Sequence, residues 1–195
     1  MTSEPSADPA RLEAAARLDG VLRRSGLSYT QVAPGEFSVE LPGEHRLRTV
    51  CWLTLGQHAL AIDAFVMRQP GENRERVWAY LLTRNANSYA VSWSIDDHGD
   101  VYLSGRLPLA SISDDEIDRV LGSVLTNADG SFDSLLQLGF GSSIRREWAW
   151  RVKNGESLRN LDAFRDFVAS TQETSSSETV ARTVPPDTVP PNTVP

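Results

Sequence analysis

The sequence predicts an α+β fold, a single domain in which helices pack on an antiparallel sheet. From Glu36 to Gly139, segments of strand periodicity and segments of helix periodicity alternate in the order β-β-β-α-β-β-α, and a helix precedes them. Short connections between the first strands favour antiparallel neighbours, because parallel strands need long crossovers. The expected order is therefore α-β-β-β-α-β-β-α, and 195 residues suffice for such a domain with extensions.

The chain is expected to divide into four regions. Residues 1–7 form a disordered N-terminus, 8–140 the α+β domain, 141–170 a C-terminal extension that packs on the domain, and 171–195 a disordered Thr/Pro-rich tail. The tail repeats the motif Thr-Val-Pro-Pro, whose prolines exclude a helix and favour an extended, solvated chain. An inert tail and a docking or phosphorylation segment are both compatible with this composition.

The first helix is expected over Asp8–Arg24. Asp8 is a suitable N-cap, Pro9 is favoured in a first turn, and Gly26 can end the helix in the left-handed conformation. Apolar residues at helical spacing form one face, which must pack on the rest of the domain. These residues are Leu12, Ala15, Leu18, Val21 and Leu22.

Three strands follow this helix. Phe37, Val39 and Leu41 alternate with polar residues, which is the pattern of a half-buried strand. The second strand, Leu47–Leu55, contains a run of contiguous apolar residues and is expected at the centre of the sheet. The third strand covers His58–Met67.

The second half of the domain begins with a helix over Glu72–Asn85. It leads into a hairpin with an acidic tip, formed by Val91–Ile95 and Val101–Leu109. Two further helices are then expected.

The first of these, Ser113–Gly139, starts with the capping-box spacing of Ser113 and Glu116 and is weakened or bent at Gly130. The second is a short helix near Leu158–Phe167.

Composition and charge exclude several classes of function. The formal net charge of −7 disfavours nucleic acid as a partner, because phosphate binding requires a basic face. A secretory signal and an apolar run of membrane-spanning length are both missing, so no membrane partner is expected. The single cysteine, Cys51, excludes a disulfide framework and a cysteine-rich zinc site. The expected compartment is the cytoplasm.

No catalytic, cofactor-binding or metal-binding residues are predicted. The three histidines, His45, His58 and His98, stand apart and lack metal-ligand spacing. Cys51 lies in an apolar strand, where a buried and inert thiol is expected. The acidic hairpin tip lacks the closing glutamate of a calcium loop. These observations predict a protein that is not an enzyme and uses no cofactor.

The order helix, Asn, hairpin, Leu-Pro-Leu, helix carries a family resemblance. Its segments are Leu81–Asn85, Ala90–Asp96, Val101–Leu103, Leu107–Leu109 and Ser113–Leu125. With these segments the chain resembles the YbjN-domain family, as an actinobacterial-type member. The fold of that family is similar to type III secretion chaperones.

The resemblance, which covers roughly Leu12–Phe140, implies a chaperone-like or regulatory interaction protein rather than an enzyme. It implies a protein partner and is compatible with a homodimer, and it provides no catalytic positions. The alternative is a small-molecule-binding or enzymatic domain whose site is assembled from scattered charged residues. These residues are Arg46, Arg48, Asp63, Arg84 and Asp96.

The tryptophans supply the candidate interface residues. Trp52, Trp78 and Trp93 occupy periodic positions and are expected in the core. Trp148 and Trp150 lie beyond the main fold and are the candidate interface residues, although large aromatic residues more often simply cap a domain.

Overall fold

The computed structural model describes residues 9–170. The chain divides into two compact units, Met1–Ser142 and Ser143–Pro195. The segments expected to be disordered, 1–7 and 171–195, lie outside the described residues.

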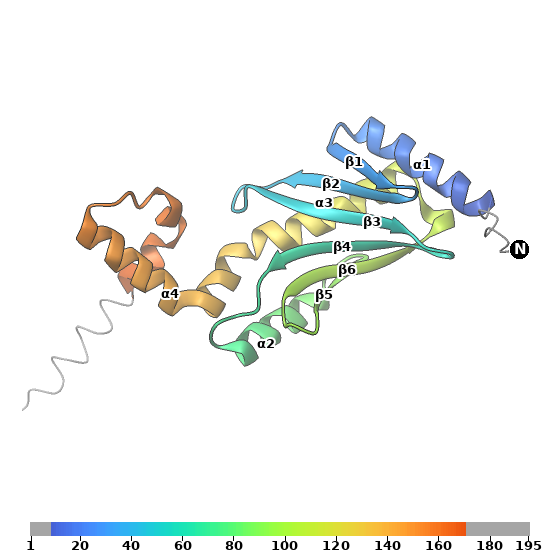
Figure 1. Ribbon diagram of the computed structural model, residues 1–195. Helices are drawn as coiled ribbons and strands as arrows, with labels where there is room; N and C mark the ends of the chain where they lie inside the picture. Colours follow the sequence, from blue (N-terminus) through green and yellow to red (C-terminus); the bar gives the residue numbers. More distant parts are fainter. Residues whose placement is uncertain (1–8, 171–195) are drawn as a thin grey trace, which may run out of the picture. The chain divides into compact units, whose positions relative to one another are not determined.

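A six-stranded antiparallel sheet forms the centre of the first unit. Its strands are β1 (Ser28–Ala33), β2 (Glu36–Pro42), β3 (Arg48–Leu55), β4 (Ala59–Met67), β5 (Val91–Ile95) and β6 (Val101–Pro108). They lie in the order β1-β2-β3-β4-β6-β5 (Figure 1). This sheet, with its helices, confirms the predicted α+β class.

Two helices cover one face of the sheet. Helices α1 (Pro9–Ser25) and α3 (Asp114–Gly130) contact each other, and they pack on the strands β2, β3 and β5 (Figure 1). Helix α2 (Arg74–Asn85) contacts β5, and a short 3-10 turn, η1 (Leu109–Ser111), joins β6 to α3. The opposite face of the sheet carries no helix of this group.

The core lies between the sheet and these two helices. Side chains alternate between the two faces of a strand, so every second residue points toward α1 and α3. The fully buried apolar strand residues include Phe37, Val39, Cys51, Leu53, Leu60, Ile62, Ala64, Val101 and Leu103. Fully burying a side chain as large as leucine stabilises a protein by about 1.5–3 kcal/mol, so this layer supplies most of the favourable free energy.

Strand β1 is a correction to the predicted element order. The sequence pattern predicts three strands after the first helix, and the structure has four. Most side chains of β1 are exposed, so the strand has no alternation of apolar and polar residues that could reveal it. From β1, the ring of Tyr29 packs against the core, and its centroid lies 6.4 Å from that of the Phe37 ring.

The long helix predicted after the hairpin is two helices. Helix α3 begins after Ser113, whose hydroxyl accepts the N–H of Glu116 at 3.3 Å, as the capping-box spacing predicts. It ends at Gly130, where the sequence predicts a weakened helix. Helix α4 (Phe132–Asn154) begins two residues later and continues past Gly139, where the sequence predicts a stop.

The predicted stop is a kink in α4. Phe140 leaves the helical conformation, with φ −141° and ψ 16°. The N–H of Glu72 donates to the carbonyl of Gly139 at 3.0 Å, and the Glu72 carboxylate accepts both the N–H and the hydroxyl of Ser142 at 2.5 Å. Glu72 thereby supplies the hydrogen-bond partners that the kink removes, and the helix can resume.

The second unit contains the end of α4 and a 3-10 helix, η2 (Arg159–Phe164), followed by helical residues 165–170. Ile144, Phe164 and Val168 are buried there. The sequence predicts a short helix in this region, and the segment is helical. Its packing on the sheet domain stays a prediction.

Asp129, near the end of α3, holds the loop between β2 and β3. Its carboxylate accepts the backbone N–H groups of Glu44, His45 and Arg46 at 2.8 to 3.1 Å. Gly43 precedes them, and a Cβ at this position would overlap the carboxylate. Burial acts to raise the pKa of Asp129, but the three amide hydrogen bonds outweigh burial and lower it.

We predict that Asp129→Asn destabilises the domain. The amide keeps one acceptor oxygen but turns a donor toward a backbone N–H, so the free energy of unfolding should fall by about 1–3 kcal/mol. Urea denaturation at pH 7, followed by tryptophan fluorescence, measures the loss. The matched control is Asp97→Asn at the exposed hairpin tip, where a change below about 0.5 kcal/mol is expected. Equal losses in both variants would contradict the role of Asp129.

His45 adds a pH-dependent tie between the same loop and α4. Its Nδ1 lies 2.7 Å from Oδ2 of Asp133, and this hydrogen bond, with the negative charge of Asp133, raises the pKa of His45. The folded pKa therefore exceeds the unfolded value of about 6.5. The stabilisation that the His45–Asp133 contact provides is fully present below the unfolded pKa. It is lost as the pH rises through the folded pKa of His45.

We predict that His45→Gln lowers the free energy of unfolding at about pH 5.5 and has little effect at about pH 9, because the histidine is then neutral in both states. Urea denaturation at the two pH values measures the difference. His58→Gln, which changes another exposed histidine, is the control. A loss of the same size at both pH values would show that charge on His45 is not involved.

Candidate interaction surface

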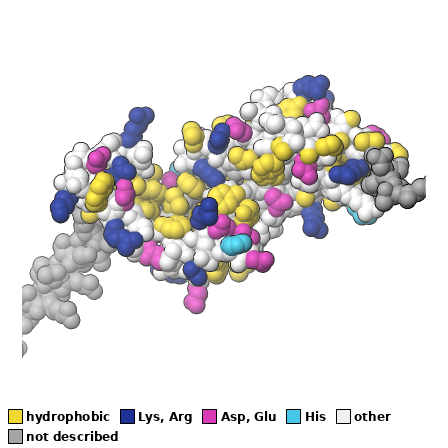
Figure 2. Space-filling model, in the orientation of Figure 1, with side chains coloured by type: hydrophobic (Ala, Val, Ile, Leu, Met, Phe, Trp, Pro, Cys, Tyr) yellow, Lys and Arg dark blue, Asp and Glu magenta, His cyan; other side chains and the backbone are white. Residues whose placement is uncertain are grey.

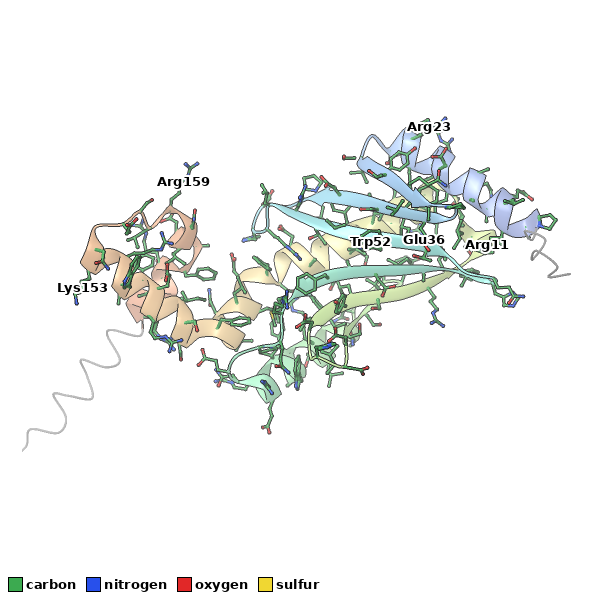
Figure 3. All side chains as sticks on the ribbon, in the orientation of Figure 1. Arg11, Arg23, Glu36, Trp52, Lys153 and Arg159 are labelled. Atoms are coloured by element: carbon green, nitrogen blue, oxygen red, sulfur yellow. The ribbon has the colours of Figure 1, made fainter. Side chains whose placement is uncertain are left out.

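The face of the sheet opposite α1 and α3 carries an exposed tryptophan at its centre. Trp52 of β3 pairs with Ser38 of β2 on one side and with Asp63 of β4 on the other. It is 43% exposed, and Figure 3 labels it on the sheet. The prediction that Trp52 belongs to the core is therefore wrong, because the core neighbours Cys51 and Leu53 point to the other face.

The other two tryptophans predicted in the core do pack there. Trp93 is buried, and Trp78 is half-buried against the core.

Aromatic side chains continue across the open face beside Trp52. Phe65 of β4 and Tyr102 of β6 are register partners with ring centroids 5.5 Å apart in an edge-to-face arrangement. Both rings are half-buried, as is Val50 of β3. Figure 2 shows hydrophobic side chains gathered over the sheet among acidic and basic ones. We call Val50, Trp52, Phe65 and Tyr102 the open-face cluster.

Arg46 borders the open-face cluster. Its guanidinium donates to the carbonyl of Phe65 at 2.8 Å and lies over the rings of Phe65 and Phe132, at 5.9 and 5.4 Å from their centroids. Burial lowers the pKa of Arg46, but an arginine stays charged at neutral pH. These interactions fix the position of Arg46 at the edge of the open-face cluster. They bring it into contact with aromatic rings and a backbone carbonyl, not with a reactive group.

The scattered charged residues of the alternative hypothesis do not form one site. Arg48 pairs with Glu40 at 2.8 Å, Arg84 lies over the ring of Tyr80, and Asp96 accepts backbone N–H groups within its own turn. Asp63 is exposed beside Trp52. Each of these groups has different neighbours, so they do not converge on a common substrate position.

Reactive and metal-binding groups are similarly isolated in the part of the chain that the structure describes. Residues 9–170 contain no group of three or more His, Cys, Asp or Glu side chains placed to hold a metal ion. Cys51 is fully buried, which confirms the predicted burial of its thiol, and this burial raises the pKa of the thiol to about 12. Within the same range, no helix is long and apolar enough to cross a membrane.

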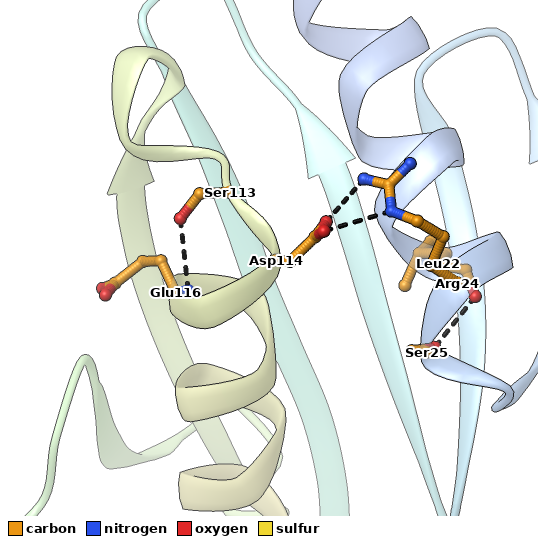
Figure 4. A network of polar contacts seen from close by, with 6 residues as sticks. All are labelled: Leu22, Arg24, Ser25, Ser113, Asp114 and Glu116. Carbon is orange, nitrogen blue, oxygen red and sulfur yellow. Dashed lines mark hydrogen bonds and ion pairs between the residues drawn. The ribbon is translucent and has the colours of Figure 1, made fainter.

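A groove of about 530 Å³ lies between α1 and the start of α3. It is crossed by an ion pair in which Arg24 Nε and Nη2 donate to the Asp114 carboxylate at 3.1 and 2.5 Å (Figure 4). This hydrogen bonding raises the pKa of Arg24 and lowers that of Asp114. Both shifts favour the charged forms, so the pair ties two helices together and is not poised to transfer a proton.

The two predicted interface residues lie in the second unit, on α4. Trp150 is 53% exposed and Trp148 is half-buried. Their role in an interface stays a prediction.

Sequence reasoning missed the open-face cluster, although a signal was present. In β3 and β4 the apolar residues occupy both faces of the strand, and the surplus falls on the face opposite α1 and α3.

Comparison with known proteins gives consistent results. The model of the YbjN family, described as "Putative bacterial sensory transduction regulator", matches residues 14–137. An uncharacterized protein of Mycobacterium tuberculosis is 44% identical over 166 residues, which cover 83% of this chain and 91% of that protein. An uncharacterized protein of Mycobacterium leprae is 49% identical over 152 residues, which cover 75% of this chain and 83% of that protein.

A solved structure shares the fold at low sequence identity. A chain in the structure of the HopA1-SchA chaperone-effector complex superposes with a TM-score of 0.50 and 14% identity. The match covers 64% of this chain and 97% of that chain. The architecture of the sheet and helices is therefore found in a protein of that complex.

Proposed function

Because the chain belongs to the YbjN family, we propose that it is a non-catalytic, chaperone-like interaction module that binds a segment of a partner protein. The family and the fold support a protein-binding module in general terms. The proposal goes further and assigns the binding to the open-face cluster. As the sequence suggests, the compartment proposed for this binding is the cytoplasm.

The exposed side chain of Trp52 is the observation that carries the proposal. A large aromatic residue at the centre of an uncovered sheet loses hydration when a partner covers it, and tryptophans frequently anchor protein interfaces. Phe65 and Tyr102 widen the apolar area on neighbouring strands. The cluster therefore has a central anchor and a half-buried surround, which is the usual arrangement of an interaction hot spot.

The border of the cluster is polar, and this favours an extended segment of mixed composition over a purely apolar one. Ser38 and Asp63 flank Trp52 directly, and the Glu40–Arg48 ion pair lies on the same face. A partner segment that places an apolar side chain on Trp52 can offer its own polar groups to these neighbours. Such polar borders contribute specificity more than affinity.

Affinity capture with purified, immobilised full-length chain tests the proposal. We expect Trp52→Ser to reduce the amount of captured partner at least about tenfold, which corresponds to about 1.4 kcal/mol or more of binding free energy. Quantitative mass spectrometry identifies and measures the captured proteins, and calorimetry with the purified partner then gives the dissociation constant. Because Trp52 is exposed, the variant should retain the fold.

Leu82→Ser provides the matched control, because Leu82 is 69% exposed on α2 and lies outside the open-face cluster. Its capture should equal that of the unchanged chain. Trp150→Ser tests the predicted interface on α4 in parallel. Capture that is unaffected by Trp52→Ser would contradict the assignment to the sheet. If no protein is captured and a metabolite copurifies instead, the interaction-module function itself is wrong.

A further inference from the structure

An exposed carboxylate lies directly beside Trp52 on the open face of the sheet. Asp63 of β4 is the register partner of Trp52, and both side chains are exposed. The Cβ atoms of such cross-strand neighbours are about 4.5–5.5 Å apart. Among residues 9–170, Asp63 forms no ion pair and no hydrogen bond through its side chain. An aromatic ring and a carboxylate are thus available side by side.

Two glutamates add negative charge on the same side of the sheet. Glu36 and Glu40 of β2 point to the face of Trp52, because the residues that alternate with them are buried in the core. Figure 3 labels Glu36 and Trp52 on the sheet. Glu40 is paired with Arg48, whereas Glu36 forms no ion pair within the described residues. The charge next to Trp52 is therefore negative.

The arginines of the open face do not reach the Trp52–Asp63 pair. Arg48 is paired with a glutamate of β2, and Arg46 lies over two other aromatic rings. Arg106 is on β6, two strands away from β3. Among residues 9–170, none of these arginines forms an ion pair with Asp63 or lies over the ring of Trp52.

Elsewhere the chain shows which group completes such a pair. Arg119 of α3 lies over the ring of Tyr89, with its guanidinium carbon 5.6 Å from the ring centroid, and donates to the Glu116 carboxylate at 2.5 Å. One arginine there contacts an aromatic ring and a carboxylate together. Trp52 and Asp63 present the same two groups without the arginine.

We propose that the partner segment supplies this arginine, which lies over the ring of Trp52 and pairs with Asp63. The inference rests on the proposed function, because it names the chemistry that the open-face cluster recognises. A planar guanidinium stacks on an aromatic face and donates in a fork to a carboxylate, which a lysine cannot do. The methylene groups of the arginine give Trp52 its apolar contact. The net charge of −7 attracts a basic segment.

The strand spacing places a second residue of the segment. Val50 precedes Trp52 by two residues on β3 and belongs to the same open-face cluster. Side chains two residues apart in an extended chain lie on one face, about 6.6 Å from each other. A segment extended along β3 therefore places an apolar side chain over Val50 when its arginine lies over Trp52. The recognised sequence is an arginine and an apolar residue separated by one residue.

Nuclear magnetic resonance of the full, isotope-labelled chain tests the arginine. The probe is the peptide acetyl-Leu-Thr-Arg-Thr-Leu-amide, and matched peptides carry lysine or citrulline, which has the shape of arginine without its charge. The indole signal of Trp52, identified by its loss in Trp52→Phe, should shift with the arginine peptide. We expect the dissociation constant to be at least about fivefold higher for the citrulline peptide. Salt at about 0.5 M should reduce this difference.

Asp63→Asn removes the charge and keeps the shape of the side chain. It should weaken binding of the arginine peptide about threefold and leave the citrulline peptide unchanged. Asp97→Asn, at the exposed hairpin tip, changes the net charge equally and should have no effect on either peptide. Both aspartates are exposed, so the fold should persist, and far-ultraviolet circular dichroism checks this.

Several results would overturn the proposal. These are equal binding of the arginine and citrulline peptides, tighter binding of the lysine peptide, or no shift of the Trp52 signal at about 10 mM arginine peptide. If Arg182→Gln moves this signal in the chain without peptide, the occupant is the chain's own segment 171–195 and not a partner.

The capture experiment separates failure of this inference from failure of the proposed function. A captured partner that is lost with Trp52→Ser but retained in full with Asp63→Asn and Glu36→Gln leaves the interaction module in place and removes the arginine. A partner retained in full by Trp52→Ser contradicts both the open-face assignment and the arginine.

Discussion

Burial of one face of the six-stranded sheet under α1 and α3 is the constraint on which the rest of the structure depends. Successive side chains of a strand point to opposite faces of the sheet, so each apolar residue lies on one face or the other. Leu53 and Ile62 take the covered face, so Trp52 and Phe65 are left on the other. The open-face cluster is thus a consequence of the core: the strands carry more apolar residues than two helices can cover.

Carboxylates from distant segments hold this arrangement where regular hydrogen bonding is interrupted. Asp129 accepts three backbone N–H groups of the β2–β3 loop, and the Glu72 carboxylate accepts the N–H of Ser142 at the kink of α4. Asn85 has a similar role at the β5 border. In each case a side chain substitutes for a missing backbone partner, which removes the cost of leaving a polar group unpaired. These contacts explain why acidic residues without reactive neighbours lie at structurally decisive positions.

The proposed interactions follow from the same geometry. Within residues 9–170, helices cover one face of the sheet and Asn85 closes one border, which leaves the other face and the other border exposed. The face is apolar at its centre and polar around it, which suits a partner segment. The carboxylate of Asp63 beside Trp52 adds negative charge at that centre, which suits an arginine of the segment.

The sequence by itself determined the elements with strong local signals. The alternation of Phe37, Val39 and Leu41 marked β2, the capping pair at Ser113 marked α3, and the apolar run around Cys51 marked a central strand with an inert thiol. These features depend on neighbours along the chain. Tertiary structure alone decided that Trp52 is exposed, that β1 exists, and that α4 continues past Phe140. The exposure of Trp52 depends on which face the helices cover, β1 depends on backbone pairing with β2, and the continuation of α4 depends on hydrogen bonds from Glu72. Apolar periodicity along the chain contains none of these.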